Sequence, residues 1–116
     1  MNGAMRGHIF ETFVVSEILK SYANAGLDYR NYLYYYNGRD NTRGQQEEID
    51  LIIEENGTLY PIEIKMTTNP NEDMLGAFNV LNKIENKKIG NGAVICNVNA
   101  IVKIKENIYA IPVQGL

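Results

Sequence analysis

The sequence contains very little of the chemistry that forms disulfides or binds soft metals, because its 116 residues include one Cys, one His and no Trp. A single Cys cannot close an internal disulfide, so no oxidising compartment is needed and a cytoplasmic location is expected. One Cys and one His also cannot build a zinc finger or an HExxH site. A Ser–His–Asp triad is open only through His8. Any metal chemistry must therefore use oxygen ligands, which suit hard ions such as Mg²⁺.

Long apolar runs and phosphate-binding glycine motifs are also missing. No stretch reaches the roughly 18 apolar residues of a membrane span, and the first six residues lack the apolar core of a signal peptide. Neither GxxxxGK[ST] nor GxGxxG occurs. The 14 acidic and 11 basic residues give a formal charge of −3, which disfavours non-specific binding of nucleic acid.

The pattern of apolar residues predicts a mixed order of helices and strands. Helices are expected over residues 6–25 and 71–86. Strands are expected at 31–36, 47–55, 58–66, 93–97 and 107–113, with a further short strand left open at 101–104. The polar stretch 37–46 is predicted to be a loop. The order helix, three strands, helix, two strands predicts one α/β (α+β) domain over residues 1–116, with a mixed sheet flanked by helices.

The dipeptide Asn56-Gly57 lies between two alternating runs and is a strong signal for a β-hairpin. A two-residue loop sets Glu55 opposite Thr58, and continuing this register sets Asp50 opposite Glu63. Two carboxylates that face each other across neighbouring strands repel. A nearby cation would relieve this repulsion, so the register suggests a site for a divalent metal ion.

Side chains alternate between the two faces of a strand, so this register also sorts the hairpin into a polar and an apolar face. The polar face is expected to carry Glu48, Asp50, Glu63 and Lys65. The apolar face is expected to carry Ile49, Leu51, Ile53, Tyr60, Ile62 and Ile64.

The first helix contributes a further carboxylate, because Glu11 falls in the middle of its apolar face. Burying an unpaired carboxylate costs several kcal/mol or shifts its pKa. If this face packs on the sheet, Glu11 can join Asp50 and Glu63. Three carboxylates and Lys65 in one crevice would suit a magnesium site for phosphoryl transfer.

At these residues the chain resembles the PD-(D/E)XK nuclease-like superfamily. The resemblance rests on Glu11 in the first helix, then Asp50, then Glu63-Ile64-Lys65 on the next strand. Further runs resemble an uncharacterised domain that follows AAA-type ATPases of bacteria and archaea. These runs are Gly7–Lys20, Glu48–Asp50, Pro61–Lys65 and Tyr109–Pro112.

The resemblance implies a restriction-endonuclease-like core and a set of site roles. Asp50, Glu63 and the carbonyl of Ile64 would ligate Mg²⁺ or Mn²⁺, and Glu11 would support the ion directly or through water. Lys65 would orient or activate the attacking water. The implied partners are a nucleic acid, with DNA the first candidate, and the AAA-type ATPase module of a larger protein from which this domain is excised or to which it is homologous. No membrane is implied, and a homodimer is left open.

Simpler interpretations of the same residues also remain open. Asp50 and Glu63 can be a solvated strand face neutralised by Lys65, and Glu11 can cap a local N–H or meet an Arg. The resemblance does not decide whether Arg39 or Arg43 matches the family's basic position, or whether His8 or Glu48 takes part. At the level of function, the alternatives to a magnesium-dependent nuclease are a catalytically silent binding or regulatory module and an inert structural remnant.

Overall fold

The computed structural model describes residues 2–40 and 45–116. In chain order its elements are α1 (Gly3–Asn24), η1 (Tyr29–Asn31), β1 (Leu33–Asp40), β2 (Gln45–Glu55), β3 (Thr58–Ile64), η2 (Glu72–Lys83), β4 (Lys88–Ile89), β5 (Gly92–Cys96), β6 (Val102–Lys105), β7 (Ile108–Pro112) and η3 (Val113–Gly115), where η denotes a 3₁₀ helix.

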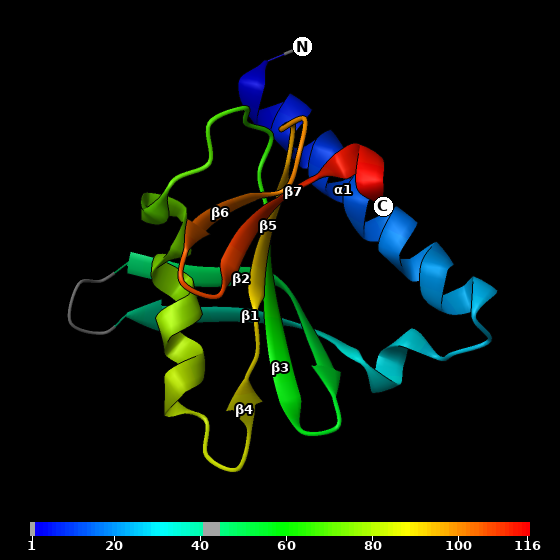
Figure 1. The fold of residues 1–116 in the computed structure, drawn as a ribbon, viewed down its shortest axis with the longest axis vertical. Coiled ribbons are helices and arrows are strands. Elements are labelled where there is room, and N and C mark those ends of the chain that lie inside the picture. The colour runs from blue at the N-terminus through cyan, green and yellow to red at the C-terminus, as the bar shows by residue number, and fades with distance from the viewer. Residues whose placement is uncertain (1, 41–44) are drawn as a thin grey trace.

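The strands form one mixed sheet of seven strands in the order β1-β2-β3-β5-β7-β6, with β4 paired to β3 (Figure 1). The pairs β1/β2, β2/β3 and β6/β7 are antiparallel, whereas β3/β5 and β5/β7 are parallel. Helix α1 packs on one face and η2 on the other, since neighbouring residues of β5 belong to two different core clusters. This architecture confirms the expected α+β class with a mixed sheet flanked by helices.

Helix α1 begins earlier than the sequence suggested and ends where it suggested. The side chain of Asn2 caps its start by accepting a hydrogen bond from the backbone N–H of Met5 at 2.8 Å. Gly26, at φ 74°, then turns the chain out of the helix, which is a conformation that glycine adopts without strain. Val14 and Ile18 are buried against the sheet. Within the described residues, no helix has the length and apolar composition needed to cross a membrane.

The second helix differs from the prediction, because residues Glu72–Lys83 form 3₁₀ turns instead of an α-helix. A 3₁₀ helix has three residues per turn, so side chains three apart lie above one another. Leu75, Phe78 and Leu81 follow this spacing, and all three are buried against the sheet. Gly76 and two Asn residues in the segment have low α-helical propensity. The apolar spacing of three is therefore the signal that distinguishes this helix.

The hairpin prediction is confirmed. Asn56 and Gly57 have φ of 53° and 81°, as a type I′ turn requires, and Glu55 pairs with Thr58. The register continues through Ile52–Pro61 to Leu51–Ile62 and ends there, so the predicted pairing of Asp50 with Glu63 is not formed.

One loop prediction needs correction, and one short strand was not predicted. The stretch 37–46 is not a loop throughout, because β1 continues to Asp40 and β2 already begins at Gln45. Residues 41–44 lie outside the described part of the chain. The sequence also gave no sign of the two-residue strand β4. The strand left open near 101–104 is present as β6.

A β-bulge in the middle of β2 changes the predicted assignment of faces. Tyr34 pairs with Ile52 but Tyr36 pairs with Ile49, so Asp50 and Leu51 together oppose the single residue Tyr35. The prediction that Ile49 shares a face with Leu51 is therefore wrong. Ile49 belongs to the cluster under η2, whereas Leu51 belongs to the cluster under α1. The extra residue bends β2 at Asp50, next to the point where β2 and β3 part.

Candidate metal centre

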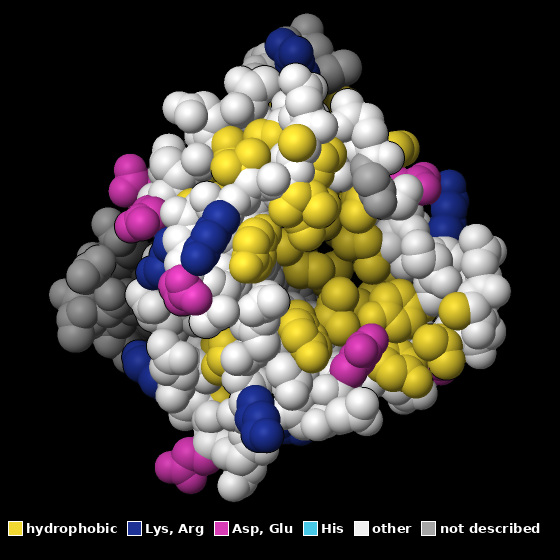
Figure 2. Space-filling model, viewed as in Figure 1, with side chains coloured by type: hydrophobic (Ala, Val, Ile, Leu, Met, Phe, Trp, Pro, Cys, Tyr) yellow, Lys and Arg dark blue, Asp and Glu magenta, His cyan; other side chains and the backbone are white. Residues whose placement is uncertain are grey.

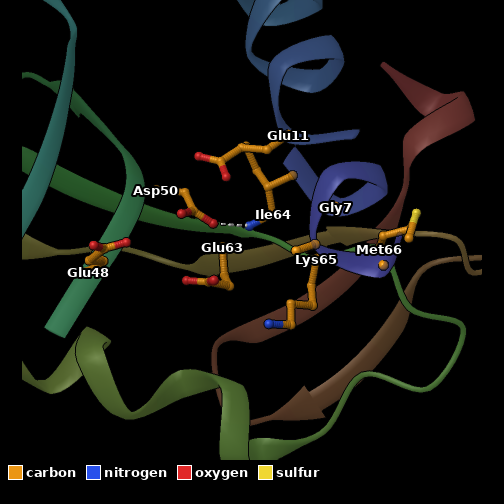
Figure 3. A pocket seen from close by; sticks show the side chains of 10 residues that line it. Gly7, Glu11, Glu48, Asp50, Glu63, Ile64, Lys65 and Met66 are labelled. Atoms are coloured by element: carbon orange, nitrogen blue, oxygen red, sulfur yellow. Dashed lines mark hydrogen bonds between the residues drawn. The ribbon is translucent and has the colours of Figure 1, made fainter. Parts of the chain in front are cut away.

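A pocket of about 420 Å³ lies where the pairing of β2 with β3 ends (Figure 3). Three separate segments line it: the first turns of α1, the bulged part of β2 and the end of β3. The lining residues are Gly3, Ala4, Gly7 and Glu11 of the helix, Glu48 and Asp50 of β2, and Glu63, Ile64, Lys65 and Met66. The pocket thus contains all of the carboxylates that the sequence singled out.

The Asp50 side chain takes the place of a missing strand partner. In an uninterrupted ladder, the backbone N–H of Ile64 would donate to the carbonyl of Ile49. The β2–β3 pairing ends before it reaches Ile49, and the N–H donates to Asp50 Oδ2 at 2.8 Å instead. This hydrogen bond, drawn dashed in Figure 3, satisfies a backbone donor at the fork and holds the Asp50 carboxylate beside β3.

The backbone carbonyl of Ile64 also faces this pocket. Lys65 N–H donates to the carbonyl of Ile95 at 3.0 Å, so the backbone polar groups of Lys65 face β5. The N–H and C=O of one strand residue point to the same edge, and this edge alternates along the strand. The polar groups of Ile64 therefore face β2, and its carbonyl lies beyond the last β2–β3 pair. The carbonyl oxygen of Ile64, which the resemblance implies as a metal ligand, thus lies on the pocket side.

Two of the carboxylates in the pocket have raised pKa values. Burial and then the negative charge of Asp50 raise the pKa of Glu63 from 4.5 to about 8, against a smaller lowering effect of Lys65. Burial and then Asp50 also raise the pKa of Glu11, while His8 lowers it. The electrostatic environment of the pocket therefore favours either protons or a cation.

The structure brings most of the predicted residues together. Figure 3 shows the carboxylates of Glu11, Asp50 and Glu63 around a common space, with Glu48 facing it from β2 and the Lys65 side chain extending beside Glu63. His8 is exposed and does not line the pocket. Arg43 and the side chain of Arg39 lie outside the described part of the structure.

Whether these residues suit a metal ion depends on chemistry and on spacing. The donor chemistry fits Mg²⁺ or Mn²⁺, since the pocket offers carboxylate oxygens and one backbone carbonyl. The spacing fits less closely. Among the side chains that the structure describes, no three Asp, Glu, His or Cys residues are grouped as a formed metal site would group them. Binding would therefore require the carboxylates to draw together.

One contribution to the pocket was not anticipated from the sequence. Gly3, Gly7 and Glu11 are spaced four apart, so they lie on one face of α1. Gly7 lines the pocket, and a Cβ there would meet no atom within 4 Å, so the space beside this turn of α1 is open. Small residues one turn apart that lead up to a partly buried acid are a signal that the sequence already carried.

Fold and pocket together define a mixed α+β domain with a carboxylate-lined pocket at a fork in its sheet. The chain belongs to the family described as Domain of unknown function (DUF4143), whose model matches residues 6–116. No curated protein and no solved structure matches the chain. Because the family description assigns no activity, any function must be argued from the pocket.

Proposed function

We propose that this chain is a PD-(D/E)XK-type nuclease domain that hydrolyses phosphodiester bonds of a nucleic acid with the aid of Mg²⁺ or Mn²⁺. One observation carries the proposal: Glu11, Asp50, Glu63, the Ile64 carbonyl and Lys65 come from three separate segments and line one pocket. Burial and the neighbouring carboxylate of Asp50 raise the pKa of Glu63. A bound cation would stabilise the ionised carboxylates, so such a cluster favours a cation as its partner. The proposal also includes that the domain functions together with an AAA-type ATPase module. This part of the proposal rests on the sequence resemblance alone.

Each residue has a role in this proposal. Asp50, Glu63 and the carbonyl of Ile64 would hold the ion, and Glu11 would support it from α1. When bound, a divalent ion would polarise the phosphodiester and neutralise charge that develops on it. Lys65 is exposed at the rim of the pocket, where its ammonium group can orient the attacking water and stabilise the phosphate.

A second candidate function is a catalytically silent nuclease-fold module that binds or regulates its partner ATPase. The observation that favours it is charge. The chain carries a formal charge of −3, and the Lys and Arg side chains on the face shown in Figure 2 are scattered instead of gathered. A surface of this kind attracts nucleic-acid phosphates weakly.

Metal binding is the first test. Mg²⁺ and Mn²⁺ would be titrated calorimetrically into the wild-type chain, Asp50→Asn and Glu55→Gln. Glu55 lies on the same strand as Asp50 but is exposed at the far turn, so Glu55→Gln is the matched control for loss of one acidic charge. We expect wild type and Glu55→Gln to bind alike and Asp50→Asn to lose binding. Equal binding by all three chains, or none by any, would exclude the metal site.

Cleavage is the second test and separates the two functions. Single- and double-stranded DNA and RNA would be incubated with the chain and Mn²⁺, alone and with the ATPase module. Cleavage that disappears in Lys65→Ala supports the nuclease. Metal binding without cleavage under every condition would favour the silent module.

A further inference from the structure

Tyr35 is the most exposed large apolar side chain among the described residues, with 77% of its surface accessible. It lies on β1, which is an edge strand of the sheet as described and pairs there with β2. A folded chain gains nothing from leaving an aromatic ring in water, since burying such a ring is favourable. This exposure therefore calls for a reason outside the packing of the chain.

The alternation of side chains places Tyr35 on the same face as α1. Leu33 packs against the core cluster under α1, and Tyr36 packs against the cluster under η2. Tyr35 lies between Tyr34 and Tyr36 in a strand that carries no extra residue itself, so it points to the α1 face and Tyr34 to the η2 face. The two tyrosines are neighbours with opposite orientations.

The register places Tyr35 beside the candidate metal centre. Across the β1–β2 pair, the single residue Tyr35 opposes both Asp50 and Leu51 of the bulge. Directly opposed residues of an antiparallel pair have Cα atoms about 4.5 to 5.5 Å apart. Asp50 in turn lines the carboxylate pocket. An exposed aromatic ring thus flanks the pocket on its β1 side.

We propose that Tyr35 is a stacking platform for an unpaired base of a single-stranded nucleic acid whose backbone crosses the pocket. This inference rests on the proposed function and narrows its substrate to single strands. A base can stack on a side chain only when it is released from its own helix. Stacking adds affinity without positive charge, which suits a chain with a formal charge of −3.

The test compares three variants in binding a fluorescently labelled oligothymidylate, followed by anisotropy with Mg²⁺ present. All proteins carry Lys65→Ala to suppress cleavage. Tyr35→Leu removes the ring, and we expect affinity to fall about tenfold or more. Tyr35→Phe keeps the ring and should bind within about twofold of the parent. Tyr34→Leu is the matched control, because Tyr34 is 47% exposed on the opposite face of the same strand, and it should also bind like the parent.

Two further readouts keep the outcomes distinct. The slope of affinity against salt should stay the same in Tyr35→Leu, since no charge is lost. Metal binding by Tyr35→Leu, measured calorimetrically, should also equal that of the parent. A damaged metal site and a lost stacking platform therefore give different results. Undiminished binding by Tyr35→Leu, an equal loss in Tyr34→Leu, or equal affinity for duplex and single strand would each overturn the inference. Absence of metal binding in every protein, including the one with Tyr35 intact, would overturn the proposed function instead.

Discussion

The carboxylate of Asp50 accepts a hydrogen bond from the backbone N–H of Ile64, 2.8 Å away, across the gap where β2 and β3 part. A side chain here replaces the backbone partner that Ile64 would have had if the β2–β3 pairing continued. Asp50 is thereby both a structural link between two strands and a member of a crowded acidic pocket. Its substitution should have two separable effects.

Comparing Asp50→Asn with Asp50→Ala isolates the structural link. Both substitutions remove the same negative charge, but only Asn keeps an oxygen that can accept the Ile64 N–H. We expect Asp50→Ala to be less stable than Asp50→Asn by about 1–3 kcal/mol, as for a buried donor left without a partner. Urea unfolding at one pH measures the difference. Equal stabilities would show that water satisfies Ile64 as well as the side chain does.

The stability of the metal-free chain should fall as pH rises through the neutral range. The pKa of Glu63 is raised from 4.5 to about 8 by burial and by the charge of Asp50. Between these values the folded chain retains a proton that the unfolded chain has released, so the free energy of unfolding decreases with rising pH. Glu63→Gln stays neutral at every pH and should weaken this dependence.

The pH prediction is checked by urea unfolding at several values between about pH 5 and about pH 8, in the presence of a chelator. Glu55→Gln is the control, because Glu55 is exposed and remote from the pocket. An unchanged pH dependence in Glu63→Gln would mean that other groups are responsible.

Metal ions should stabilise the folded chain if the proposed centre exists. A ligand that binds only the folded state at about one hundred times its dissociation constant adds about 2.7 kcal/mol. We expect Mn²⁺ to raise the melting temperature of the wild type, and a chelator to reverse the rise. Asp50→Asn should show no rise, whereas Glu55→Gln should behave as the wild type does. A rise of equal size in Asp50→Asn would place the ion elsewhere.

Gly90 should be intolerant of a side chain for a packing reason. A Cβ at this position would overlap the ring of Tyr60 on β3, and it would lie 3.0 Å from Thr58 Cγ2. We expect Gly90→Ala to lower the free energy of unfolding by about 1–3 kcal/mol, which is typical of overpacking. Chemical denaturation measures this loss.

Gly76 supplies the control for Gly90. It lies in η2, where a Cβ would meet no atom within 4 Å. Gly76→Ala should therefore raise the free energy of unfolding by about 0.4–1 kcal/mol, because Ala lowers the conformational entropy of the unfolded chain. The penalty at Gly90 should also shrink when Tyr60 is replaced by Ser, because the overlapping ring is gone. If Gly90→Ala lowers the free energy of unfolding as much in Tyr60→Ser as in the wild type, the ring of Tyr60 is not the cause.

The helix and hairpin could be predicted because their signals are local. The polar cap Asn2 and the stop at Gly26 belong to α1 itself, and the Asn56-Gly57 turn sets the register of the strands it joins. The loop prediction over 37–46 was wrong because polar composition does not prevent two strands of a hairpin from extending past the core. The η2 helix was assigned the wrong type because spacings of three and four residues overlap in a short amphipathic segment.

The residues of the candidate site could be predicted, but their geometry could not. The alternating pattern around Asp50 and Glu63 predicted a shared polar face in an unbroken ladder. The bulge and the end of the β2–β3 pairing replaced that ladder with a fork, which Glu11 approaches from α1. A bulge depends on packing against both faces of a sheet, so it has no reliable local signal.

By itself, the sequence determined that nitrogen and sulfur ligands are limited to one His and one Cys, and which carboxylates a two-residue turn brings near one another, because composition and turn geometry are local properties. The tertiary structure alone decided that Ile49 and Leu51 face opposite cores, that Asp50 holds the Ile64 N–H, and that Tyr35 stands exposed beside them. These features depend on where β2 bends and on what α1 and η2 cover. They are set by contacts between segments far apart in the chain, which no short stretch of sequence specifies.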